Sequence, residues 1–253
     1  MEVFSMKKVV RNFKVMAVLL AAAAFSFSAG AGYAAQVTPE AGKAKAEPQL
    51  AFSTITHQEE AFEASIQVPI LRGTGNAELE KRLNERFLED AVAVYRSFVL
   101  RMGEMKNMGA GYFSIATASR IAAHGNGLLS LEHRVTETMA SSGTLVRFDN
   151  IDLGTGREIA LSDLFKDDRY TKPLTKIVKS LMKEEMKKDK ATAYFLEEVP
   201  EVRKDQPFYI EDGKLVLVFD QGTVAPYSMG ARSFVIPTKP IKGLLAPSQS
   251  YLK

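Results

Sequence analysis

The sequence predicts an α+β protein with a mostly antiparallel sheet, one long N-terminal amphipathic helix and a second helix, and it leaves open a division into two subdomains. Apolar residues recur every three to four positions over residues 77–105. Three strand-like runs separated by glycine-containing turns follow, and an Asp-Gly pair joins two apolar runs near the C-terminus. Strand runs that follow helices, without regular βαβ alternation, are typical of α+β folds.

The first 34 residues have the pattern of an export signal. Four basic residues and one acid precede an apolar run over residues 15–25, and small residues follow up to Ala35. This order indicates a signal peptide over 1–34 that is cleaved before Ala35. The alternative is a membrane anchor that is not cleaved, because residues 15–35 carry no charge and a stretch of this length can just span a bilayer. Residues 35–49 are predicted to be a disordered tether, since they contain few large apolar side chains.

The charge balance and the lack of cysteine exclude several function classes. The chain has 33 Lys+Arg and 30 Asp+Glu, and removing residues 1–34 leaves 29 of each. A neutral domain lacks the basic surface of a nucleic-acid binder, so we expect no nucleic-acid partner. Without cysteine, disulfides, thiol catalysis and cysteine-ligated zinc are excluded. We expect no cofactor and no metal.

Residues 50–153 are predicted to form a strand–helix–meander subdomain. A half-buried strand over residues 61–69 is expected to end at Pro69. The helix over 77–105 begins after Asn76, whose side chain can cap its first turn. Short strands are predicted at 51–56, 112–123, 128–139 and 144–153, with turns at 124–127 and 140–143.

Residues 154–245 are predicted to form a second subdomain, and residues 246–253 a tail. A glycine turn and a short strand come first, and a helix follows with Pro173 in its first turn. Asp212-Gly213 predicts a hairpin, because this pair tolerates positive φ at both turn positions.

Few residues suggest catalysis. We interpret His57, His124 and His133 as surface histidines, because none has a partner at metal-ligand spacing. Ser180 and Lys183 match S-x-x-K, but the companion motifs of penicillin-recognising enzymes are absent. A glycan hydrolase would need two facing acids, and the sequence offers Asp149, Asp152 and Asp163 for that alternative.

The loop within FDQGTVAPYSMGARSFVIP (219–237) raises a choice between binding and turn formation. Pro226 prevents the chain from continuing as a central strand, and the two glycines permit unusual backbone angles. We favour the structural interpretation, with Tyr227, Met229 and Arg232 as candidate binding residues beside it.

Two segments resemble one family. NIDLGTGREIALSDLFKDD (150–168) and QPFYIEDGKLVLVFDQGTVAPYSMGARSFVIP (206–237) look like the extracytoplasmic domain of RsiV-type anti-sigma factors, which also precedes the catalytic part of PdaC-type peptidoglycan deacetylases. The resemblance covers about residues 50–245. It implies a receptor that binds lysozyme, or an accessory module, and in neither case the catalyst.

The expected function is therefore an exported, non-catalytic binding module of the bacterial cell envelope, secreted or periplasmic. Its partner would be a protein such as a lysozyme-like hydrolase, or peptidoglycan. Two alternatives remain, namely a cell-wall glycan hydrolase that uses paired carboxylates and a membrane-tethered sensor with an uncleaved N-terminal helix.

Overall fold

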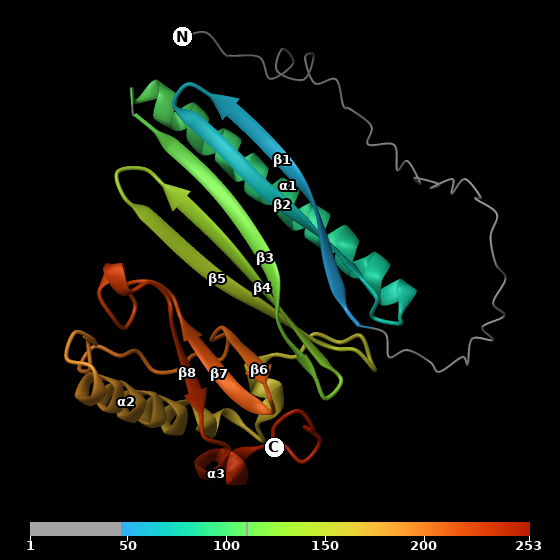
Figure 1. The fold of residues 1–253 in the computed structure, drawn as a ribbon, viewed down its shortest axis with the longest axis vertical. Helices are drawn as coiled ribbons and strands as arrows, with labels where there is room; N and C mark the ends of the chain where they lie inside the picture. Colours follow the sequence, from blue (N-terminus) through green and yellow to red (C-terminus); the bar gives the residue numbers. More distant parts are fainter. Residues whose placement is uncertain (1–46, 110) are drawn as a thin grey trace, which may run out of the picture. The chain divides into compact units, whose positions relative to one another are not determined.

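The computed structural model describes residues 47–109 and 111–253, so the predicted signal peptide and nearly all of the tether lie outside the described residues. The predicted fold class is confirmed. A five-stranded, mostly antiparallel sheet and a three-stranded antiparallel sheet are accompanied by few helices (Figure 1). The described residues belong to one compact unit. The boundary between the two subdomains stays a prediction.

The larger sheet has the strand order β1-β2-β3-β4-β5. Its one parallel pairing joins β2 to β3 over only four residue pairs, from Phe62 with Phe113 to Ser65 with Ala116. The predicted meander of three strands is present and antiparallel, with a register shift between Ile121 and Ala123 in the first hairpin. The strands are β1 (Gln49–Glu59), β2 (Phe62–Arg72), β3 (Phe113–Gly125), β4 (Leu128–Thr138) and β5 (Ser142–Asp152).

The prediction that the second strand ends at Pro69 is wrong, because β2 continues to Arg72. The backbone N–H groups of Gln67 and Leu71 point away from β1, towards the side chains of Thr117 and Asn84. Pro69 lies between them on the same side, where β3 has already diverged. The missing N–H of Pro69 therefore removes no ladder hydrogen bond.

Helix α1 (Ala77–Asn107) covers one face of this sheet (Figure 1). The Asn76 side chain caps it by accepting a hydrogen bond from Leu79 N at 3.0 Å, and acids occupy the first turn, where the helix dipole favours them. Its buried stripe packs on apolar residues of the strands in two clusters. The stripe consists of Leu79, Leu83, Phe87, Ala91 and Phe98.

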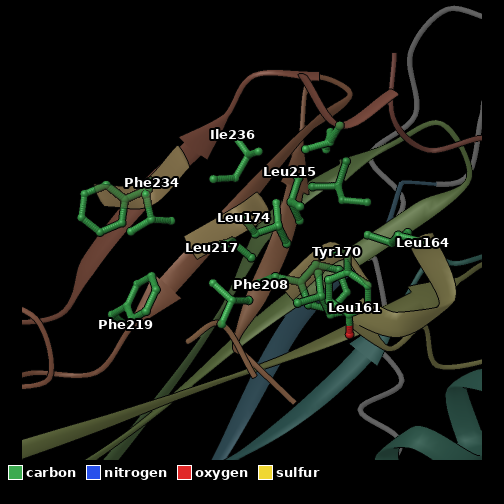
Figure 2. Packing of buried hydrophobic residues seen from close by; sticks show 14 of the residues in the cluster. Leu161, Leu164, Tyr170, Leu174, Phe208, Leu215, Leu217, Phe219, Phe234 and Ile236 are labelled. Atoms are coloured by element: carbon green, nitrogen blue, oxygen red, sulfur yellow. The ribbon is translucent and has the colours of Figure 1, made fainter. Parts of the chain in front are cut away.

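The smaller sheet has the order β6-β7-β8, formed by β6 (Phe208–Glu211), β7 (Lys214–Phe219) and β8 (Arg232–Ile236). The predicted Asp-Gly hairpin is confirmed, with φ of 51° at Asp212 and 74° at Gly213. Helix α2 (Thr171–Lys188) packs on this sheet and buries Leu174, Val178 and Met182. Figure 2 shows the shared core, in which Leu174 lies near Leu217 and Phe208.

Shorter features lie between and after these elements. The short strand predicted after the glycine turn is wrong, because the turn leads only into an isolated bridge between Ile151 and Glu158. A 3-10 turn (Leu161–Leu164) follows directly, so the segment folds into the core instead of extending a ladder. Helix α3 (Thr238–Ile241) follows β8.

A buried polar bridge joins the two sheets. Asn150 of β5 donates to the Phe208 carbonyl of β6 at 2.9 Å and accepts from Ser130 of β4 at 2.6 Å. Such satisfied groups fix one arrangement of the layers, because leaving any of them unpaired would be costly. Over residues 47–109 and 111–253, no helix is both long and apolar enough to cross a bilayer.

Candidate functional site

The crossover loop between β7 and β8 protects the outer edge of β5. Asp220 Oδ1 accepts from Val146 N, and Gln221 Oε1 accepts from Thr144 N, each at 3.1 Å. Gln221 also donates to the Tyr227 carbonyl at 2.8 Å, which ties the far half of the loop to the near half. The structural role predicted for this loop thus has a specific form, in which its side chains replace the missing neighbour of an edge strand.

Tyr227 packs against the crossover loop and remains exposed. Its ring packs so closely on Gly222 that a Cβ there would lie 2.5 Å from a ring carbon, and Gly222 has a φ of +78°. The Tyr227 hydroxyl approaches Gly143, where a Cβ would lie 3.4 Å from it. Tyr227 is nevertheless 56% exposed, and Met139 at the base of the same hairpin turn is 48% exposed.

We call the Tyr227 side chain and the hairpin tip 139–143 the crossover surface. Met229, in the 3-10 turn with Tyr227, is partly buried against the core below the loop. The crossover surface therefore presents the aromatic ring of Tyr227 and the thioether of Met139 beside small residues, and hydrogen bonds hold the loop beneath it. That combination suits protein recognition, since rigid aromatic residues supply most contact energy at interfaces.

Arg232 is held by contacts with Tyr194 and with Glu185 of α2. Its guanidinium donates to the Tyr194 hydroxyl at 2.6 Å and pairs with Glu185 at 3.0 Å. Burial and the bond to Glu185 raise the pKa of Tyr194 to about 12, although Arg232 opposes this. Arg232 is thus a link between β8 and α2, and the three candidate binding residues do not form a single cluster.

A second constellation lies under α1, and the sequence did not predict it. His133 of β4 has Ser119 Oγ 2.9 Å from Nδ1 and Asp149 Oδ2 3.1 Å from Nε2. Asp149 of β5 also pairs with Arg86 of α1 at 2.5 Å. The His133 ring lies 5.4 Å from the ring of Phe87, also on α1. Serine, histidine and aspartate therefore meet in contact beside a cavity of about 170 Å³.

The charges around Asp149 explain its ionisation. Its side chain is only 3% exposed, and burial alone would raise its pKa. The contacts with His133, Arg86 and Arg147 outweigh burial, so the pKa of Asp149 lies below its ordinary value. An ionised Asp149 joins helix and sheet at one point, which is a structural use of a buried charge.

This cluster lacks features of a hydrolytic triad. A catalytic aspartate orients and stabilises the imidazolium, but Asp149 is already paired with a guanidinium. The backbone N–H of Ser119 donates to Gln67 Oε1 at 3.1 Å, so it is not directed at a reacting oxygen. We interpret the cluster as a clamp between α1 and the sheet.

The other acids named for a hydrolase are engaged locally. Asp152 accepts from Thr155 N at 2.7 Å and from the Tyr251 hydroxyl. Burial would raise the pKa of Asp152, but the hydrogen bonds together outweigh it and lower the pKa. Asp163 accepts from Ala160 N at 3.0 Å. The bonds from Thr155 N and Ala160 N are turn and cap bonds, the ordinary use of aspartate at such positions, and the bond from Tyr251 fastens the C-terminal segment to Asp152.

The remaining candidates are divided between surface and interior. Ser180 and Lys183 are exposed on α2, and His124 is exposed at the end of β3. The surface interpretation of His133 is wrong, because its side chain is only 13% exposed, whereas His57 is half-buried at the surface and contacts Tyr95 and Glu59. In the described part of the chain, no three His, Asp or Glu side chains gather as metal ligands.

Comparison with known proteins gives three kinds of match. A family model described as "Protein of unknown function (DUF3298)" matches residues 162–239. Anti-sigma-V factor RsiV of Bacillus subtilis (strain 168) is 35% identical over 202 residues, which cover 78% of this chain and 70% of that protein.

Two solved structures of DUF3298 proteins share the fold. A protein of Bacteroides fragilis aligns with a TM-score of 0.55 at 17% identity, covering 79% of this chain and 93% of the other. A protein of Pseudomonas aeruginosa aligns with a TM-score of 0.57 at 16% identity, covering 79% and 94%. At these identities the structures support the architecture alone.

Proposed function

Because the chain belongs to the family of anti-sigma-V factor RsiV, we propose that it is a binding module of the bacterial cell envelope whose ligand is a lysozyme-like protein. The proposal names Tyr227 and the hairpin tip 139–143 as the contact surface. It places the domain outside the cytoplasm, as the export signal predicts. The named relative is an anti-sigma factor and not an enzyme, which favours binding over catalysis.

The observation that carries the proposal is the exposed Tyr227 on a fixed base. Its backbone carbonyl is held by Gln221, and its ring lies against Gly222. An aromatic side chain that is already oriented loses little conformational freedom when it enters a partner's pocket. Met139 beside it supplies an adaptable apolar contact.

Titration of the purified protein with lysozyme by calorimetry tests this proposal. We expect saturable binding, and Tyr227→Ala should weaken it about thirtyfold, the effect of losing a tyrosine hot spot. Tyr112→Ala is the matched control, because Tyr112 is also exposed and its hydroxyl contacts Glu63 at the start of β2. The control should bind as the unaltered protein does.

Two results would contradict the proposal. If lysozyme does not bind, it is not the ligand of this protein. If both tyrosine variants weaken binding equally, Tyr227 does not mark a specific contact surface. A parallel sedimentation assay with purified peptidoglycan shows whether the wall polymer is bound instead.

The N-terminal segment needs its own test. The intact mass of the protein recovered from the envelope and the medium decides between the two expectations for it. Loss of the first 34 residues supports a signal peptide. Retention of the segment supports the membrane-tethered sensor.

A further inference from the structure

The outer edge of β1 is a second surface of interest. β1 is the first strand in the order of the larger sheet and runs for 11 residues, from Gln49 to Glu59. Its residues pair in one continuous register with β2 and with no other described strand. A long edge strand offers a row of backbone donors and acceptors to another chain.

The bonding pattern shows which residues face outward. Ala61 O, just before β2, and Gln67 N and Leu71 N of β2 are all directed away from β1, so the even-numbered residues of β2 bond to β1. The register pairs those residues with odd-numbered residues of β1. The outward N–H and C=O groups of β1 therefore belong to Leu50, Phe52, Thr54, Thr56 and Gln58.

The strand carries none of the devices that usually block such an edge. Residues 49–58 contain no lysine, arginine, proline, aspartate or glutamate, and the register with β2 shows no bulge. Phe52 is 44% exposed. Glu59 at the end is paired with Lys106 of α1, so its charge is already balanced.

Thr54 is the middle one of the five outward residues. An antiparallel pairing of β1 with itself places Leu50 opposite Gln58, Phe52 opposite Thr56 and Thr54 opposite Thr54. No like charges meet in this register, and the aromatic ring faces a β-branched residue, a favourable cross-strand pair. The five outward residues of each copy all find a partner, so the register leaves no outward group of this set unpaired.

We propose that the β1 edge binds a second copy of this chain, antiparallel and centred on Thr54, so that the two larger sheets become continuous. The lack of Lys, Arg, Asp and Glu over residues 49–58 favours this occupant, because two copies of the strand meet in an isologous pairing without like-charge repulsion. The interface consists mainly of backbone hydrogen bonds, so the association should be weak and concentration-dependent. It does not depend on the proposed ligand, since the crossover surface lies at the β5 edge.

Sedimentation of the processed form that the cell produces, over about a hundredfold range of concentration, tests the pairing. We expect a reversible monomer–dimer equilibrium. Thr54→Pro removes the central outward N–H from both copies without touching the bonds to β2, and should weaken dimerisation about tenfold. Thr54→Lys places two ammonium groups opposite each other and should abolish dimers at low salt. Leu100→Lys, on the exposed face of α1, adds the same charge and should leave dimers unchanged.

The absence of natural cysteine allows a geometric test. Opposed residues of a hydrogen-bonded antiparallel pair have Cα atoms about 5.5 Å apart, within reach of a disulfide. Thr54→Cys should therefore form a dimer under mild oxidation, whereas Leu100→Cys should not. A protein that stays monomeric at all concentrations overturns the proposal, as do dimers that neither Thr54→Pro nor Thr54→Lys weakens.

Discussion

The two edge strands of the larger sheet differ in whether other described residues hydrogen-bond to their outer sides. The β5 edge is covered by Asp220 and Gln221 from the crossover loop and by the segment around Ile159, which donates to Asn150 O at 2.7 Å. The β1 edge has no such cover among the described residues and no charge along residues 49–58. The crossover loop, whose sequence suggested a binding motif, therefore has a structural role, because it supplies the hydrogen-bond acceptors that the β5 edge would otherwise lack.

The same loop leaves its outer side exposed to solvent. Tyr227 is fixed by the groups that seal β5 and yet remains exposed. Structural and binding interpretations of the loop are therefore compatible, because its inner atoms bond to the sheet and its outer atoms face solvent. The open β1 edge is the contrasting case, with backbone groups as its main recognition elements.

The largest effect should come from the clamp that fastens β5 to α1. Asp149→Ala leaves Arg86 and His133 without their buried partner and should lower the free energy of unfolding by about 3–5 kcal/mol. Urea denaturation measures it. Asp90→Ala removes an exposed pair with Arg147 in the same region and should cost at most about 1 kcal/mol. Equal losses would show that Asp149 is no clamp.

The next effect compares the two edges directly. Asp220→Ala leaves the N–H of the buried Val146 without its charged acceptor and should lower the free energy of unfolding by about 1.5–3 kcal/mol. Thr54→Pro on the β1 edge removes no intramolecular bond and should change it by less than about 1 kcal/mol. If the proline variant is the less stable one, the assignment of sealed and open edges is wrong.

The smallest effect concerns pH. The pKa of Asp149 is lowered in the folded protein, so its contribution is complete above the unfolded value of about 3.9 and is lost as the pH falls through the folded value. Between about pH 6 and about pH 3, the unaltered protein should lose more stability than Asp149→Ala does. An equal loss of stability in both proteins over this pH range would contradict the lowered pKa of Asp149.

The local elements could be predicted because their signals are local. The spacing of the strand-like runs and their turns predicted the meander, and Asp212-Gly213 predicted the hairpin of the smaller sheet. The end of the second strand at Pro69 could not be predicted correctly. A proline removes a ladder hydrogen bond only if the side of the strand that lacks its N–H faces a neighbouring strand. At Pro69 that side has no neighbour, because β3 pairs with β2 only over Phe62–Ser65.

The cluster of Ser119, His133 and Asp149 was missed for a similar reason. Counting back from the turn after Gly125 pairs Ser119 with Arg134. The register shift between Ile121 and Ala123 moves the pairing by one residue and brings Ser119 opposite His133. A one-residue slip changes the face of every side chain, so the sequence pattern alone could not bring this cluster together.

Hydrogen exchange of backbone amides with and without lysozyme distinguishes the crossover surface from the rest of the larger sheet. We expect added protection at residues 139–143 and 221–230 when lysozyme is bound, with unchanged exchange along Gln49–Glu59. Protection confined to β1, or to the strands beside His133, would contradict this expectation.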